Sequence, residues 1–445
     1  MREAGIMKGR SVFFNLTAVG AAEVVSRAAQ LATVALMSRH FGPAGMGVIG
    51  TAWAFYTMAV PFVQYSPETM GIREIARNPW RLSVIGEINL LKLATAIGAA
   101  ALLSALAALL YRDRPATALQ IAVQSSVLIG LALSAAWVFR GMQHFESHAG
   151  IRVFQAVAMA VGLYLVLPGL PHPWAVPAVE LATFLGAAAI GFLLLQRSLT
   201  GRRRSSPRPP FLSFKRRRQA VRRHGYAVAT QGLTGLAAAV TWLVCIPEAG
   251  LFLAEEQVGN LAAALRLIIA VNAIIVLLHQ LFFPILARET SHGPEAGREL
   301  AAALLFYVTL IATAVYGLLA VLAKPLCALI LGPEFVDAAG LVQWMGVLIV
   351  VAGVTEVYKC ILLAANQERL VLLLEAAVAT TILVVNLVAF SFWPVPHAAM
   401  AMIAVMALHL LVLACFCHGR ELIGRRSFAL SRLGPSKVGD FLRAR

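Results

Sequence analysis

Long apolar stretches recur along the whole chain and constrain its fold more than any other feature. A membrane-spanning helix needs about 20 predominantly apolar residues to cross about 30 Å of hydrocarbon. The sequence contains twelve such stretches, rich in Ala and Leu and without the alternation typical of strands. We therefore predict an all-α integral membrane protein with about 12 transmembrane helices. The expected spans are residues 11–37, 44–65, 85–110, 116–139, 151–167, 176–195, 226–246, 258–286, 300–322, 338–363, 371–390 and 398–417.

The composition excludes several classes of protein. Hydrophobic residues make up 60% of the chain and charged residues only 13%, against about 25% charged in soluble proteins. A water-soluble fold cannot cover that much apolar surface. Soluble enzymes, disordered chains and nucleic-acid-binding domains are thus excluded, despite a net charge of +16.

The basic residues predict the topology. If the N-terminus is cytoplasmic, 29 of the 37 Lys and Arg residues fall on the cytoplasmic side. The opposite side holds four, Arg39, Arg112, Arg114 and Lys324. Cytoplasmic loops of membrane proteins carry an excess of positive charge. We therefore expect both termini in the cytoplasm.

A basic segment divides the spans into two sets of six. We predict an N-terminal six-helix lobe (1–195), a basic cytoplasmic linker (196–225), a C-terminal six-helix lobe (226–417) and a basic cytoplasmic tail (418–445). The linker is expected to contact anionic lipid headgroups rather than nucleic acid. Two sets of six suggest an internal repeat, in which the segment from Phe41 to Gly47 before the second span corresponds to Val258 and Gly259 before the eighth, and the end of the fourth span to that of the tenth.

Two arginines lie deep inside predicted spans. Charged groups in spans are functional candidates, because they are costly unless they face protein or water. Arg27 and Arg266 occupy the first and eighth spans, Arg27 about 15 Å from the predicted outer end of its span. Facing one cavity, two guanidiniums would bind phosphate or pyrophosphate. Alternatively, Glu23 forms an ion pair with Arg27 along the same helix, since they are four residues apart.

Other span residues are weaker candidates. Lys92 is expected to extend its ammonium group to the membrane surface, and Lys359 to pair with Glu356, so a structural role is favoured for both lysines. Glu23 is the deepest acidic residue and the candidate coupling site for proton-driven transport.

Two prolines interrupt predicted spans. Pro61 and Pro284 lie in the second and eighth spans and are candidate hinges, although packing accounts for membrane prolines equally well.

Catalytic and metal-binding motifs are missing from the sequence. It contains no DxD, P-loop or GxSxG motif, and His172, His279, His397 and His409 have no carboxylate or Cys partner at metal-ligand spacing. We expect no enzyme activity, no cofactor and no metal site.

Four stretches together resemble a known family. SRHFGPAGMGVIG (38–50) and GIREIARNP (71–79) resemble the N-terminal signature of bacterial polysaccharide and O-antigen flippases. EEQVGNLAAALRL (255–267) and LILGPEFVDAAGLVQWM (329–345) are similar to two later segments of these proteins. This family belongs to the multidrug/oligosaccharidyl-lipid/polysaccharide (MOP) exporter superfamily.

The resemblance implies two lobes around a central cavity in the bacterial inner membrane. It implies flipping of undecaprenyl-pyrophosphate-linked oligosaccharide units by alternating access, for lipopolysaccharide or exopolysaccharide synthesis. Arg27 and Arg266 match family arginines of spans one and eight by position, whereas span two contains no basic residue. Implied partners are the lipid-linked substrate, membrane lipids and polysaccharide polymerase or other assembly proteins. Alternatives are a cation-coupled exporter of drugs or small metabolites, a membrane enzyme of glycan assembly and a non-transporting scaffold.

Overall fold

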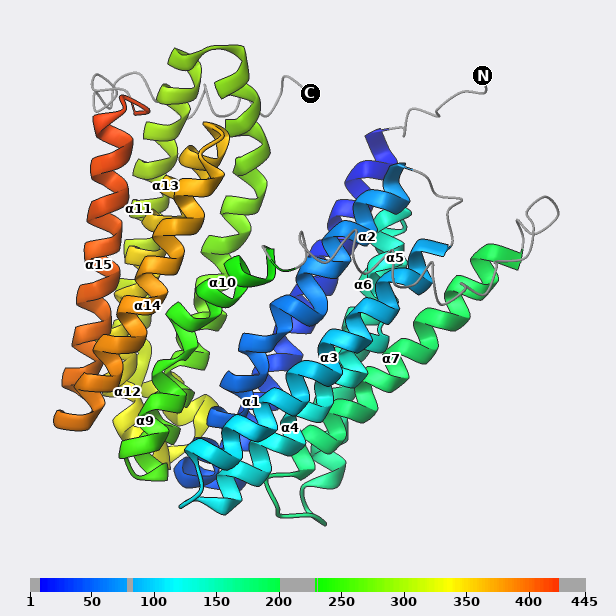
Figure 1. Ribbon diagram of the computed structural model, residues 1–445, viewed down its shortest axis with the longest axis vertical. Helices are drawn as coiled ribbons and strands as arrows, with labels where there is room; N and C mark the ends of the chain where they lie inside the picture. Colours follow the sequence, from blue (N-terminus) through cyan, green and yellow to red (C-terminus); the bar gives the residue numbers. More distant parts are fainter. Residues whose placement is uncertain (1–8, 78–82, 201–228, 230, 424–445) are drawn as a thin grey trace. The chain divides into compact units, whose positions relative to one another are not determined.

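The computed structural model describes residues 9–77, 83–200, 229 and 231–423, and every regular element in these ranges is helical (Figure 1). The first half contains α1 (Gly9–Val60), η1 (Pro61–Tyr65), α2 (Ser66–Arg77), α3 (Ser83–Leu110), α4 (Pro115–Leu133), α5 (Ala136–Gly141), α6 (Phe145–Val166) and α7 (Ala175–Thr200). The second half contains α9 (Cys245–Phe252), α10 (Glu255–His292), α11 (Pro294–Leu326), η3 (Cys327–Leu331), η4 (Pro333–Phe335), α12 (Val336–Met345), α13 (Leu348–Ala364), α14 (Glu368–Phe392) and α15 (Val395–Gly419). Helices satisfy their own backbone hydrogen bonds, as a span in lipid requires.

The apolar helices account for the predicted spans and confirm the all-α membrane fold. Within the described ranges, ten elements are long and apolar enough to cross a membrane, and the bent pair Gln231–Leu243 and Cys245–Phe252 adds an eleventh. The first element, Gly20–Ala76, contains residues 20–37 of the first predicted span and all of the second. They are separate helices of α1 that meet at Gly42, whose φ of 60° breaks the helix. The fifth span is longer than predicted, because α6 begins at Phe145 rather than at residue 151.

The helices pack into two compact units. The first comprises the described residues up to Gly259 together with Leu329–Glu334, and the second comprises Asn260–Ala328 with the described residues from Phe335 onward. The seventh apolar segment thus packs with the first unit. Most of the predicted linker and tail lies outside the described residues, and the division into two six-helix lobes stays a prediction.

A buried hydrogen bond fixes the seventh segment within the first unit. Tyr111, just after α3, donates its hydroxyl to the backbone oxygen of Pro247 in α9 at 2.5 Å. Burial raises the pKa of Tyr111, so the phenol keeps the proton that it donates.

Two glycines that the sequence aligns as repeat equivalents contact each other in this unit. A Cβ on Gly259 would lie 1.7 Å from the backbone oxygen of Pro43 and 3.0 Å from the nitrogen of Gly47. A Cβ on Gly47 would lie 2.1 Å from the backbone oxygen of Glu255. Only glycine allows the beginning of α10 to approach α1 so closely.

The ends of the fourth and tenth spans also share a backbone conformation. Gln143 (φ 60°) follows α5 and Asn366 (φ 57°) follows α13. In both places the next residue donates its N–H to a carbonyl five residues earlier, from His144 to Phe139 and from Gln367 to Leu362. The same left-handed cap ends α15 at Glu421, so it is a common helix ending rather than a mark of the repeat.

Candidate functional site

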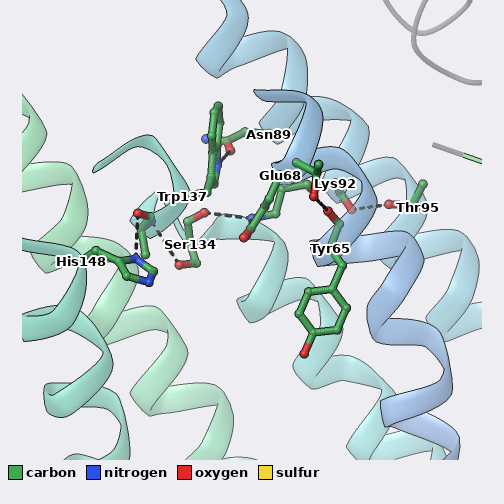
Figure 2. A network of polar contacts seen from close by, with 10 residues as sticks. Tyr65, Glu68, Asn89, Lys92, Thr95, Ser134, Trp137 and His148 are labelled. Carbon is green, nitrogen blue, oxygen red and sulfur yellow. Dashed lines mark hydrogen bonds and ion pairs between the residues drawn. The ribbon is translucent and has the colours of Figure 1, made fainter. Parts of the chain in front are cut away.

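A buried ion pair lies at the break of the fourth span. Lys92 of α3 is fully buried, and its Nζ lies 2.8 Å from Oε1 of Glu68 in α2 and 3.0 Å from the backbone oxygen of Ser134 (Figure 2). Ser134 is extended between α4 and α5, and Val138 donates its N–H to Ala135 instead of to Ser134. The ammonium group therefore satisfies both a buried carboxylate and a carbonyl that the broken helix leaves without a backbone donor.

The side chains of Asn89 and His148 also contact α5 at the break between α4 and α5. The indole nitrogen of the buried Trp137 lies 3.2 Å from Oδ1 of Asn89, and Nδ1 of His148 lies 3.2 Å from the backbone oxygen of Ala136 (Figure 2). Polar groups from α3 and α6 thus bind the backbone and the side chains of α5. The arrangement is structural, since it satisfies buried polar atoms.

The prediction that Lys92 reaches the membrane surface is wrong. Its side chain has no exposed area, because Glu68 lies within hydrogen-bonding distance inside the unit. The sequence analysis missed Glu68, because the predicted second span ends at residue 65. In the structure α2 continues the helical path to Arg77, so Glu68 stays beside α3. The structural role favoured for Lys92 agrees with these contacts.

A second, more exposed cluster joins α1 to α6. Nε of Arg27 lies 2.9 Å from Oε1 of Glu23, as the four-residue spacing predicts, and Nη1 of Arg27 lies 3.5 Å from Oε1 of Gln30. Nη2 of Arg152, on α6, lies 3.8 Å from the other oxygen of Glu23. One carboxylate thus lies between two guanidiniums.

The position of Arg27 along its helix differs from the prediction. Because α1 remains helical to Gly42, Arg27 is about 22 Å from the end of that helix rather than about 15 Å. Its neighbour Arg152 is only seven residues from the beginning of α6 at Phe145. Arg27 therefore lies level with the first two turns of α6.

Arg266 belongs to the second unit. It lies on α10 and is 9% exposed, so it is buried to a greater extent than Arg27. Its helix neighbours Leu265 and Leu267 are also buried. A buried guanidinium in a span requires polar surroundings, which keeps Arg266 a candidate.

The second unit contains its own buried charge cluster, on α13, α14 and α15. Lys359 pairs with Glu356 in the preceding turn, as predicted. Its Nζ also lies 3.2 Å from Oε1 of Glu375, and the same oxygen lies 3.4 Å from Nε2 of His409. Glu375 and His409 are buried, whereas Glu356 is half exposed. The cluster ties three helices together.

The two hinge candidates have different surroundings. Pro61 is buried and begins the π-helical turn η1, which ends with a hydrogen bond from the N–H of Ser66 to the backbone oxygen of Pro61. A Cβ on Gly235 would lie 2.6 Å from the Cβ of Pro61, so the proline also packs on the seventh segment. Position 284 falls within the helical range of α10, and the side chain of Pro284 lies outside the described part. The hinge role stays a prediction for both.

Charged residues of the first unit that the sequence analysis missed include Glu68, Arg152, Glu180 and the buried Glu248 of α9. Glu180 lies within the sixth predicted span, where its Oε2 accepts a hydrogen bond from Nε2 of Gln124 at 2.6 Å. Arg152 is the second residue of the predicted fifth span but was counted with the cytoplasmic basic residues. A systematic inspection of every ionisable residue within the spans would have found both.

Among the described residues, no group of three or more His, Cys, Asp or Glu side chains has the arrangement of a metal site. Among the charged side chains of the spans, Arg27, Lys92 and Lys359 form ion pairs with carboxylates.

The fold is that of MOP superfamily transporters. An inward-facing multidrug resistance MATE family transporter of this superfamily aligns with a TM-score of 0.68 and 13% identity, over 92% of this chain and 96% of that one. The lipid II flippase MurJ in an inward closed conformation aligns with a TM-score of 0.59 and 12% identity, over 90% and 87%. A MOP superfamily transporter from Pyrococcus furiosus gives 0.51 and 13%, over 91% and 94%.

The sequence identifies the family within this class. A family model described as polysaccharide biosynthesis protein matches residues 12–290, more than half of the chain, and the chain belongs to this family. A search of curated proteins gives no match. Together these findings define a multi-pass membrane protein of the polysaccharide biosynthesis family with the fold of MOP superfamily transporters.

Proposed function

We propose that this protein flips undecaprenyl-pyrophosphate-linked oligosaccharide units from the cytoplasmic to the outer leaflet of the bacterial inner membrane. The observation that carries the proposal is a half-exposed arginine, Arg27, within an apolar helix of a polysaccharide-family protein. An exposed guanidinium in a span must face a polar space rather than lipid. An anionic headgroup is the substrate that such a space attracts.

The chemistry of the substrate fits this site. The lipid tail remains in the bilayer, while the sugars and the pyrophosphate cross through the polar space between helices. Exposure of the charged headgroup to hydrocarbon is thereby avoided. Arg27 and Arg266 are the proposed pyrophosphate-binding residues, because one guanidinium group binds phosphate oxygens through two parallel hydrogen bonds. Movement of helices around Pro61 and Pro284 would open the site to each side of the membrane in turn.

The test is a leaflet assay in cells that lack the protein. We expect complete lipid-linked repeat units to accumulate on the cytoplasmic leaflet, as measured by mass spectrometry combined with a sidedness assay. Normal delivery to the outer leaflet would contradict the proposal and favour a cation-coupled exporter of drugs or small metabolites. Glycan bond formation by the purified protein would indicate an enzyme of glycan assembly instead.

Two variants test the proposed residues. Arg27→Ala and Arg266→Ala are expected to insert normally and to lose transport, because each removes a headgroup contact. Arg112→Ala serves as the matched control, since Arg112 is an exposed arginine of the first unit beyond the end of α3. Full transport by both Arg27→Ala and Arg266→Ala would contradict the assignment of the site.

A further inference from the structure

The cluster of Glu23, Arg27 and Arg152 has the geometry of an occupied anion site. The two oxygens of the Glu23 carboxylate face different arginines, Oε1 at 2.9 Å from Nε of Arg27 and Oε2 at 3.8 Å from Nη2 of Arg152. The arginines come from different helices, α1 and α6, so their spacing is set by helix packing. A single anion held between two fixed guanidiniums is the arrangement that phosphate recognition uses.

Exposure separates this cluster from the buried pair nearby. The side chains of Arg27, Arg152 and Glu23 are 44%, 46% and 36% exposed. All three lie on apolar helices of span length, close to the beginning of α6, and charged groups on such helices need polar surroundings. A ligand can therefore reach the guanidiniums without unfolding the unit.

The cluster has a net positive charge, which favours an anionic ligand. Two arginines and one glutamate give a local net charge of +1, and a pyrophosphate has more negative charge and more acceptor oxygens than a carboxylate.

We propose that Arg27 and Arg152 together bind the pyrophosphate of the substrate, and that Glu23 occupies the site until the pyrophosphate displaces it. This inference rests on the proposed function and deepens it. It adds Arg152 as a substrate-binding residue contributed by the fifth span. It also gives Glu23 the role of an internal competitor, which keeps the arginines paired in the substrate-free protein.

Displacement predicts opposite effects for substitutions of Arg152 and of Glu23. Arg152→Ala removes charge-assisted hydrogen bonds to the ligand and should weaken binding at least about tenfold. Glu23→Gln removes the competing charge and should tighten binding by about threefold or more. A purely structural ion-pair cluster predicts that loss of either partner disorders the arginines and weakens binding.

Binding is measured with the full-length protein in lipid nanodiscs. The probes are undecaprenyl pyrophosphate and, separately, inorganic pyrophosphate. The variants are Arg152→Ala, Arg152→Lys and Glu23→Gln, with Arg112→Ala as the matched control expected to bind like the wild type. Arg152→Lys should retain part of the affinity, because it keeps the charge but loses the planar fork. Elution volume and thermal midpoint are recorded for each variant to establish that it is folded.

The two probes distinguish the source of the anion. Weaker binding of both probes by Arg152→Ala supports a site for pyrophosphate itself, and a loss confined to the lipid probe supports a site for the lipid headgroup. Unchanged binding by Arg152→Ala, or weaker binding by Glu23→Gln, would overturn the proposal.

A transport assay distinguishes failure of this inference from failure of the proposed function. If cells lacking the protein deliver lipid-linked units normally, the proposed function fails. If those cells show the defect but Arg152→Ala restores full transport, only the role of Arg152 fails. Loss of transport by a folded Arg152→Ala, with retention by Arg112→Ala, supports both.

Discussion

Two ion pairs in the first unit have similar short distances but opposite surroundings. Lys92 and Glu68 are 2.8 Å apart with side-chain exposures of 0% and 9%. Arg27 and Glu23 are 2.9 Å apart with exposures of 44% and 36%. A buried pair cannot lose one partner without leaving an isolated charge, whereas an exposed pair exchanges its partner for water or ligand. Within the first unit, side-chain exposure distinguishes the binding candidate Arg27 from the structural pair of Lys92 and Glu68.

The largest effect on stability is expected from Lys92→Ala. The substitution leaves the Glu68 carboxylate and the Ser134 carbonyl buried without their donor, so the free energy of unfolding should fall by about 3–5 kcal/mol. Thermal unfolding of the purified protein in detergent measures the change.

The double variant Lys92→Met/Glu68→Leu sharpens this test. Because it removes both charges, it should recover most of the stability that Lys92→Ala loses. A loss below about 1 kcal/mol for Lys92→Ala would show that Glu68 becomes hydrated and that the pair is less buried than its geometry indicates.

A smaller loss is expected from Lys359→Ala in the second unit. Glu375 keeps its contact with His409, and Glu356 is half exposed and becomes hydrated, so we expect a loss of about 2–3 kcal/mol. The matched control is Glu356→Ala, which removes the exposed partner only and should change stability by about 1 kcal/mol or less. Equal losses for the two variants would contradict the importance of the Glu375 contact.

The smallest change in stability is expected from Arg27→Ala. Exposed ion pairs contribute about 0–1 kcal/mol, so the thermal midpoint should remain close to that of the wild type. The same sample should fail to restore transport in cells. Destabilisation as large as that of Lys92→Ala would contradict the comparison and assign Arg27 a structural role.

Local spacing in the sequence predicted some of these contacts and missed others. The pairs Glu23–Arg27 and Glu356–Lys359 follow from separations of four and three residues on one helix. The partners of Lys92 are 24 and 42 residues away in sequence, and no local pattern indicates them. The proximity of Arg152 to Glu23 likewise depends on how α6 packs on α1.

The sequence by itself determined the class of the protein. Apolar runs of span length dictate membrane helices, since a backbone in hydrocarbon must satisfy its own hydrogen bonds. The order of its motifs also indicated the flippase resemblance. Only the tertiary structure decided which charged residues are buried and which remain accessible. The reason is physical. Burial of a side chain depends on which helices pack against its own helix, and the spacing of residues along one helix does not determine that packing.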